Sequence, residues 1–163
     1  MQKRNVWLMN FFQYIALAFV ALLSEAGLEA HATTDILGRL WGKAIANATI
    51  NPLTALWRVA NGEVTRGDER RKVAESLAKE AVSVALASGV EPAIGDPVAY
   101  VESVCRATAA NRSSMLQDVE RGRPTEIDSI NGVIVAQGLS HGVPTPFNEA
   151  VWLLVRGLCD AAA

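Results

Sequence analysis

One row of polar side chains is set apart by its spacing. Lys43, Asn47 and Asn51 recur every four residues, which places an ammonium group and two carboxamides on successive turns of one helix face. A solvated face normally mixes charges of both signs, whereas the neighbours here, such as Trp41 and Ile45, are apolar. The row is therefore either a generic exposed face or the polar side of a site for a small ligand.

Two further groups of polar residues occur later in the chain. Asn111, Ser113 and Ser114 form one cluster, and Glu126 follows a Gly-Arg-Pro turn. Taken alone, Asn111 and the serines could cap a helix, and Glu126 could be a first-turn acid that the helix dipole favours. Combined with Lys43, these groups would suit a small anionic ligand, because they supply donors for a carboxylate, a lysine beside a carbonyl, and a carboxylate to hold that lysine.

The elements that must position these groups are predicted to be helices. From Asp35 onward, alanine-rich segments are separated by glycine and proline, and alternating β-branched runs are almost absent. We predict an all-α domain of five to seven helices, in which Asp35 caps the central helix that carries Lys43. Because Pro52 lacks an amide donor and disfavours a helical residue before it, this helix is predicted to kink or end near Pro52.

Glycine and proline also mark the bounds of the later helices. They are predicted to run from Asp68 to Gly89, from Val98 to about Ala110, over residues 115–119, from Thr125 through Ile134, and from Phe147 to Leu158. Helical periodicity assigns the inward-facing residues: Val73, Leu77, Ala81 and Val84, then Ile127, Ile130 and Ile134, and in the last helix Phe147, Val151, Leu154 and Leu158.

Composition limits the class of protein. Half of the 163 residues are apolar, 20% are charged and the formal net charge is -2, which is typical of one folded domain and excludes a disordered chain. The near-neutral charge gives no basic surface, so nucleic acid is not an expected partner. Cys105 and Cys159 lie far apart without a zinc or CxxC spacing. We therefore expect no metal site and a reduced, cytoplasmic protein.

The first 27 residues form a separate segment, which precedes a helical domain over residues 28–163. Val6–Leu23 is an 18-residue, mainly apolar run, so it could be a signal peptide or a membrane anchor. Asn10 and Gln13 inside the run are costly in lipid, which makes a membrane anchor the less favoured alternative. We favour a helix that Gly27 caps and that is buried between the chains of a homo-oligomer.

Four longer stretches carry a resemblance to a known family. They are Trp41–Leu56 (WGKAIANATINPLTAL), Asn111–Asp118 (NRSSMLQD), Thr125–Gly132 (TEIDSING) and His141–Asn148 (HGVPTPFN). In this order they resemble the C-terminal domain of the 2-dehydropantoate 2-reductases, also called ketopantoate reductases, over roughly residues 19–158. The resemblance implies an all-α fold of the ketopantoate reductase or 6-phosphogluconate dehydrogenase C-terminal type.

The resemblance also implies an activity and roles for the polar residues. Enzymes of this family reduce 2-dehydropantoate, a small 2-oxo acid, to pantoate with NADPH, in the biosynthesis of pantothenate and coenzyme A. Lys43 would be the general acid that protonates the 2-oxo group, and Glu126 would help to orient it. The remaining residues would contact the substrate: Asn47 and Asn51 through hydrogen bonds, Ser114 at the carboxylate, and Asn111 along the same site.

One part of the family pattern is missing from the sequence. The family's enzymes carry an N-terminal Rossmann domain with a GxGxxG phosphate loop, and these 163 residues contain neither the loop nor a preceding strand. We therefore expect a substrate-binding and association half that is inactive alone, with a separate Rossmann-domain protein as a candidate partner. The alternative is a non-catalytic helical interaction or dimerisation protein, although a pure scaffold has no physical need for Lys43 or Glu126.

Overall fold

The structure, a computed structural model, describes residues 2–160, with side chains for residues 12–158. Within the described residues every regular element is helical: seven α-helices, one short 3-10 turn and one π-helical turn, and no strand. This confirms the predicted all-α fold of five to seven helices. The chain forms two compact units, Met1–Ile36 and Leu37–Ala163, which are described separately. The division after residue 27 stays a prediction.

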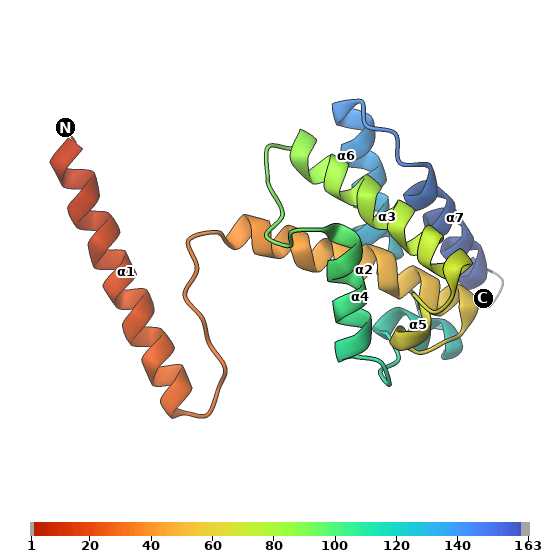
Figure 1. Cartoon of the computed structure of the whole chain (residues 1–163), viewed down its shortest axis with the longest axis horizontal. Coiled ribbons are helices and arrows are strands. Elements are labelled where there is room, and N and C mark those ends of the chain that lie inside the picture. The colour runs from red at the N-terminus through yellow and green to blue at the C-terminus, as the bar shows by residue number, and fades with distance from the viewer. Residues whose placement is uncertain (1, 161–163) are drawn as a thin grey trace. The chain divides into compact units, whose positions relative to one another are not determined.

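The first unit is built around helix α1, which spans Gln2–Glu25 (Figure 1). Gly27 ends this helix with a left-handed φ of 77°, and the Leu28 amide donates to the Leu23 carbonyl at 2.9 Å. This is the Schellman arrangement, in which a residue without a Cβ takes the left-handed position, so the predicted Gly27 cap is confirmed. Within the described part of the chain, no helix combines the length and the hydropathy needed to cross a membrane.

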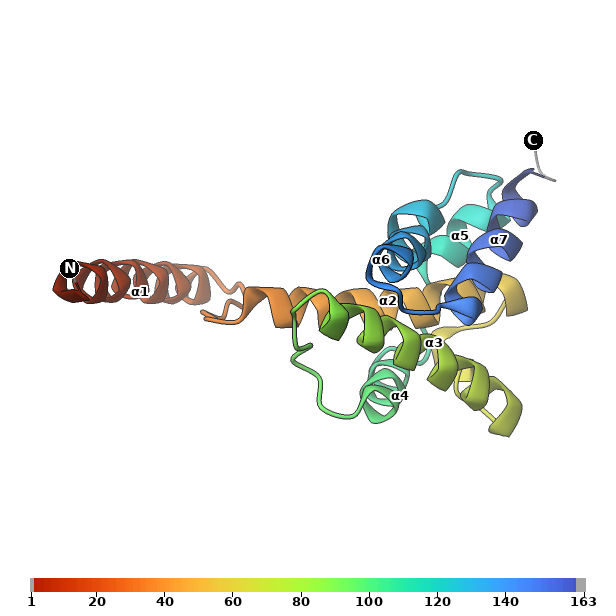
Figure 2. The same cartoon turned by 90° about the horizontal axis from the view of Figure 1, so that it is seen from above.

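The second unit is organised around helix α2, which spans Ile36–Trp57. Figure 2 shows α2 between two groups of helices. On one side lie α3 (Asp68–Ala87) and α4 (Pro97–Ala107), and on the other α5 (Ser114–Glu120), α6 (Val133–His141) and α7 (Pro146–Asp160). Because α2 lies between these helices, its side chains form part of the core, and Ile45, Ala48 and Leu53 are buried.

Pro52 lies inside α2, which continues to Trp57. Of the two predicted alternatives, an end of the helix near Pro52 is therefore wrong, and a kink there stays a prediction. Proline removes the amide that would donate to the carbonyl of Ala48, four residues earlier. That carbonyl instead accepts a hydrogen bond of 2.9 Å from the Nδ2 group of Asn131. A side chain distant in sequence thus supplies the donor that local sequence reasoning could not provide.

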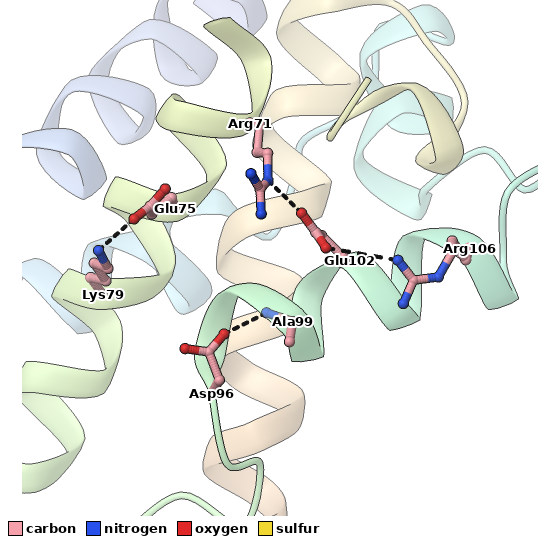
Figure 3. Close-up of polar contacts among 7 residues, drawn as sticks. All are labelled: Arg71, Glu75, Lys79, Asp96, Ala99, Glu102 and Arg106. Carbon is pink, nitrogen blue, oxygen red and sulfur yellow. Dashed lines mark hydrogen bonds and ion pairs between the residues drawn. The ribbon is translucent and has the colours of Figure 1, made fainter. Parts of the chain in front are cut away.

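Helices α3 and α4 pack against each other and against α2. Leu77, Ala81 and Val84 of α3 are buried, as predicted, and Val73 is partly buried. Figure 3 shows how the charged faces of the two helices meet: the Arg71 Nε group donates to the Glu102 carboxylate at 2.6 Å. The hydrogen bond and charge of Glu102 raise the pKa of Arg71.

Helix α7 buries a different face from the one predicted. Val151 is buried, but Phe147 and Leu154 are 43% and 57% exposed, so their assignment to the inward stripe is wrong. The buried positions are Asn148, Val151 and Val155, which recur at helical spacing on one face. Asn148 is buried where hydropathy predicted its neighbour Phe147 to be. Its side chain can be buried because it forms hydrogen bonds with Asn131 and with the Leu77 carbonyl.

Candidate functional site

A pocket of about 460 Å³ lies beside the first half of α2. Its walls come from α2 and from the first residues of α6 together with the turn before them. The α2 wall contains Leu37, Leu40, Trp41, Lys43, Ala44 and Asn47, and the other wall contains Ser129, Ile130, Val133 and Ile134. The structure therefore brings two of the six predicted site residues, Lys43 and Asn47, into one pocket.

The loop before α4 packs closely against α2 next to the turns that carry Lys43 and Asn47. Gly42 packs so tightly that a Cβ on it would lie 2.6 Å from a methyl carbon of Ile94. Next to this contact, the Ala93 amide donates to the Gly38 carbonyl at 3.0 Å. The glycine therefore lets the loop before α4 cover one side of α2, while residues 43 and 47 line the pocket.

Lys43 is exposed at the pocket, and Asn47 is partly buried. Lys43 forms no ion pair with any of residues 12–158. In this part of the chain, Lys79 does form one, with Glu75. An ammonium group without an internal carboxylate partner can interact with an anionic or carbonyl oxygen of a ligand. Lys43 therefore has the chemistry required of a group that stabilises negative charge.

The opposite wall begins with a π-helical turn, η2, which spans Asp128–Gly132. Gly132 makes this turn fit, because a Cβ there would lie 3.1 Å from the indole nitrogen of Trp152. The same nitrogen donates to the Asp128 carboxylate at 2.6 Å. Single π turns inside helices occur frequently at functional sites, and here the turn contributes Ser129 and Ile130 to the pocket.

Ser129 is a pocket residue that sequence reasoning missed. It stands three residues after Glu126, a spacing that could have placed it on the same turn. The π turn was not anticipated, because helical periodicity predicts one regular helix from Thr125 through Ile134. Glu126 itself is exposed, and its carbonyl accepts the amides of Ser129 and Ile130. It is not among the residues that line the pocket, and its role stays a prediction.

The remaining predicted residues lie near the second half of α2. The Thr54 hydroxyl donates to the Asn51 carbonyl at 2.8 Å and lies 2.6 Å from the Ser113 hydroxyl. Ser113 is the N-cap of α5, because its hydroxyl accepts the Leu116 amide at 3.0 Å. Ser114, the first residue of α5, and Asn111 are exposed at this end. Asn51, Asn111 and Ser114 do not line the pocket, so their binding roles stay predictions.

The pocket suits a small molecule with an oxygen-bearing polar end and an apolar part. Its polar groups are one ammonium, one carboxamide and one hydroxyl, and its other lining residues are apolar. A dinucleotide site of the Rossmann type places its phosphate loop between a strand and a helix, and residues 2–160 contain no strand. The described residues therefore do not form a site of this type.

Comparison with known proteins tests the family resemblance that the sequence carries. Residues 35–158 match the family described as "Ketopantoate reductase PanE/ApbA C terminal". The 2-dehydropantoate 2-reductase of Archaeoglobus fulgidus is 45% identical over 137 residues, which are 84% of this chain and 46% of that protein. The enzyme of the same name from Pyrococcus horikoshii is 37% identical, over 82% of this chain and 44% of that protein.

Solved structures with this helical arrangement are also similar in sequence. The PanE/ApbA family ketopantoate reductase of Ralstonia eutropha aligns with a TM-score of 0.82 at 31% identity, covering 90% of this chain and 49% of that one. A D-mandelate dehydrogenase, solved with NADH and anilino(oxo)acetate, aligns with a TM-score of 0.81 at 31% identity, covering 89% of this chain and 61% of that one.

The chain spans about half the length of the curated relatives it matches. The matched part is the helical unit that contains the pocket, because residues 35–158 include both of its walls. The chain therefore belongs to the ketopantoate reductase family, in which it corresponds to the helical C-terminal domain.

Proposed function

We propose that the pocket beside α2 is the substrate half of the active site of an NADPH-dependent 2-dehydropantoate 2-reductase, which forms pantoate for pantothenate biosynthesis. The observation that carries the proposal is the placement of Lys43 and Asn47 on one pocket wall, with Ser129 on the other, in a chain of this family. The names of the relatives support the choice of reaction.

Lys43 would act on the carbonyl that is reduced. As the 2-oxo group becomes an alcohol, negative charge grows on its oxygen, and a positioned ammonium group stabilises this charge and donates the proton. Asn47 would hold the substrate by hydrogen bonds beside Lys43. The reaction also needs a hydride, which NADPH would supply from a nucleotide-binding domain outside these 163 residues.

The other predicted residues would complete the site around the pocket. Asn51 would contact the substrate from the second half of α2, and Asn111 would contact it from the segment before α5. Ser114 would bind the carboxylate of the substrate. Glu126 would orient Lys43 or the substrate from the turn that precedes Ser129.

Exposed apolar side chains around the pocket support a docked partner domain. Leu37, Leu40 and Val133 line the pocket and are 57%, 53% and 48% exposed. We propose that the nucleotide-binding domain covers them, since clustered exposed apolar residues commonly mark interaction sites. The apolar residues of α1, among them Phe19 and Leu22, would be buried in a homo-oligomer. A cytoplasmic location also stays a prediction.

A second substrate class follows from the apolar lining. Trp41, Ile130 and Val133 would also accommodate a 2-oxo acid with an aromatic substituent, and the likeness to a D-mandelate dehydrogenase supports testing this class. Parallel assays of this chain fused to a family Rossmann domain, with 2-dehydropantoate and with 2-oxo-2-phenylacetate, would distinguish the two substrates. We expect the higher kcat/KM for 2-dehydropantoate.

The experiment that tests the proposed function combines the chain with a family Rossmann domain. NADPH oxidation is followed with 2-dehydropantoate, using the chain alone, the Rossmann domain alone, and their mixture or fusion. We expect activity in the combination and none in either part, because positioning the two reactants supplies much of the rate enhancement. A folded fusion that binds NADPH but shows no turnover would favour the non-catalytic interaction protein.

A further inference from the structure

Pro52 leaves one backbone acceptor of α2 without its helical donor. In an uninterrupted helix the amide of residue 52 would donate to the carbonyl of Ala48, but proline has no amide hydrogen. Ala48 is fully buried, so water cannot easily replace that donor. A buried carbonyl left unpaired is costly, and the fold must supply another donor at this point.

Asn131 is the residue that supplies this donor. Its Nδ2 atom lies 2.9 Å from the Ala48 carbonyl oxygen, and the side chain is fully buried. The orientation of the carboxamide is fixed, because a carbonyl can only accept and the facing atom must therefore be the nitrogen. The Oδ1 atom consequently points elsewhere and has no hydrogen-bond partner among the described residues.

A second set of bonds holds Asn131 from behind. Its Nδ2 group also donates to the Oδ1 atom of Asn148 at 3.0 Å. The Nδ2 group of Asn148 donates in turn to the Leu77 carbonyl at 3.2 Å and to the Glu80 carboxylate at 2.8 Å. The two asparagines therefore link α2, η2, α7 and α3 through hydrogen bonds that use all four of their side-chain N–H donors.

The position of this bond relates it to the pocket. Asn47 directly precedes Ala48 and lines one wall, while Ile130 directly precedes Asn131 and lines the other. We propose that Pro52 and Asn131 act as a positioning pair: proline frees the Ala48 carbonyl, and asparagine binds it, which fixes the two walls of the substrate pocket relative to each other. This inference rests on the proposed function of the pocket.

A double-mutant cycle tests the pair without a ligand. Urea unfolding of the full 163-residue chain is measured for the wild type, Pro52→Ala, Asn131→Ala and the double variant. Alanine at position 52 restores a backbone donor for the Ala48 carbonyl. The factor by which Asn131→Ala raises the unfolding equilibrium constant should therefore be about tenfold smaller in the Pro52→Ala chain than in the wild type. Pro97 provides the control, because at the first position of α4 it leaves no helical acceptor unpaired. Pro97→Ala should show no coupling to Asn131→Ala.

Binding of 2-dehydropantoate tests the positioning role. The ligand is titrated into 15N-labelled chain, and the Asn47 side-chain amide signal reports on the pocket. At a temperature where circular dichroism shows each variant folded, Asn131→Ala should weaken binding at least about tenfold. The added Pro52→Ala change should not restore binding, because it gives Ala48 a donor within α2 but does not rebuild the bond between the two walls. Cys105→Ala, a buried change outside the pocket lining, should leave the Kd unchanged, which separates positioning from general destabilisation.

The outcomes distinguish this inference from the proposed function. A wild-type chain that does not bind 2-dehydropantoate overturns the proposed function, and the positioning role with it. Wild-type binding that Asn131→Ala does not weaken overturns the positioning role alone. A double variant that is as destabilised as Asn131→Ala, or that fails to fold along with it, also overturns the inference. Coupling in stability, together with binding that Asn131→Ala weakens and that stays weak in the double variant, supports it. Binding restored by Pro52→Ala would show that the loss came from destabilisation and would overturn the positioning role.

Discussion

Glu80 on α3 binds Asn148 on α7 twice, although 68 residues separate them in sequence. Its Oε2 atom accepts the Asn148 backbone amide at 2.9 Å and the side-chain amide at 2.8 Å. Its Oε1 atom accepts the Phe147 amide at 2.9 Å. First-turn amides have no acceptor within their own helix, and the helix dipole favours a carboxylate there. Glu80 is therefore the N-terminal cap of α7, provided from another helix.

Removal of this cap should destabilise the domain. Glu80→Ala is expected to lower the free energy of unfolding by about 2 kcal/mol, because it leaves three donors at the start of α7 without their carboxylate. Glu75→Ala is the matched control on the same helix, since Glu75 forms an exposed pair with Lys79, and such pairs contribute less than about 1 kcal/mol. Urea unfolding measures both, and equal losses would contradict the capping role.

The sequence predicts helix ends better than helix interiors in this chain. Gly27 and Gly89 end α1 and α3 with left-handed backbone angles, as expected, because a glycine cap depends on local conformation alone. Pro52 does not end α2, because the replacement donor Asn131 comes from a part of the chain 79 residues away. No pattern within a few residues of Pro52 contains that information.

In the candidate site, too, the features that depend on local sequence were predicted, and those that depend on distant residues were not. Helical spacing grouped Lys43, Asn47 and Asn51 on one helix face, and the structure places Lys43 and Asn47, but not Asn51, in the pocket lining. Ser129 was missed, since the sequence predicts a regular helix at this point, whereas the structure has a π turn at Asp128–Gly132. Phe147 and Leu154 were assigned inward by hydropathy, whereas the buried position belongs to Asn148, whose partners lie on other helices.

Two helical glycines should respond to alanine in opposite directions. A Cβ on Gly138 would lie 2.8 Å from the Val143 carbonyl oxygen, which is backbone and cannot easily move. Gly138→Ala should therefore destabilise the domain by about 2 kcal/mol. Gly157 has nothing within 4 Å of the same position, so Gly157→Ala should stabilise α7 by about 0.5 to 1 kcal/mol. Thermal unfolding compares them, and changes of the same sign would contradict this prediction.

Arg58 offers a stabilising substitution. It has a φ of 54° and ends α2 in a Schellman arrangement, because the Val59 amide donates to the Thr54 carbonyl at 3.2 Å. A residue with a Cβ pays about 1 kcal/mol in this conformation. Arg58→Gly should recover about that amount in urea unfolding, while Arg58→Ala, which keeps the Cβ, should not. A gain with alanine as large as with glycine would exclude backbone strain as the cause.

Cys105 should make stability depend on pH in the alkaline range. Burial raises the pKa of its thiol from 9.0 to about 11, partly offset by a hydrogen bond to Thr65. The unfolded thiol loses its proton first, so its contribution is complete below about pH 9 and is lost as the pH rises through about 11. Between these values, wild-type unfolding free energy should fall more steeply than that of Cys105→Ala, by up to about 1.4 kcal/mol per pH unit. Parallel profiles would contradict the raised pKa.

Lys43 should be essential for turnover once a nucleotide domain is supplied. In a fusion of this chain to a family Rossmann domain, Lys43→Ala should lower kcat at least about a hundredfold, because the developing alkoxide loses its charge partner and proton donor. Lys79→Ala is the matched control: Lys79 is an exposed lysine on α3, paired with Glu75 outside the pocket, and kcat should change less than about twofold. Circular dichroism and NADPH affinity verify that both variants are folded and loaded. If Lys43→Ala kept full turnover, the proton would have to come from another group, and the pocket beside α2 would lose its assignment as the site of reduction.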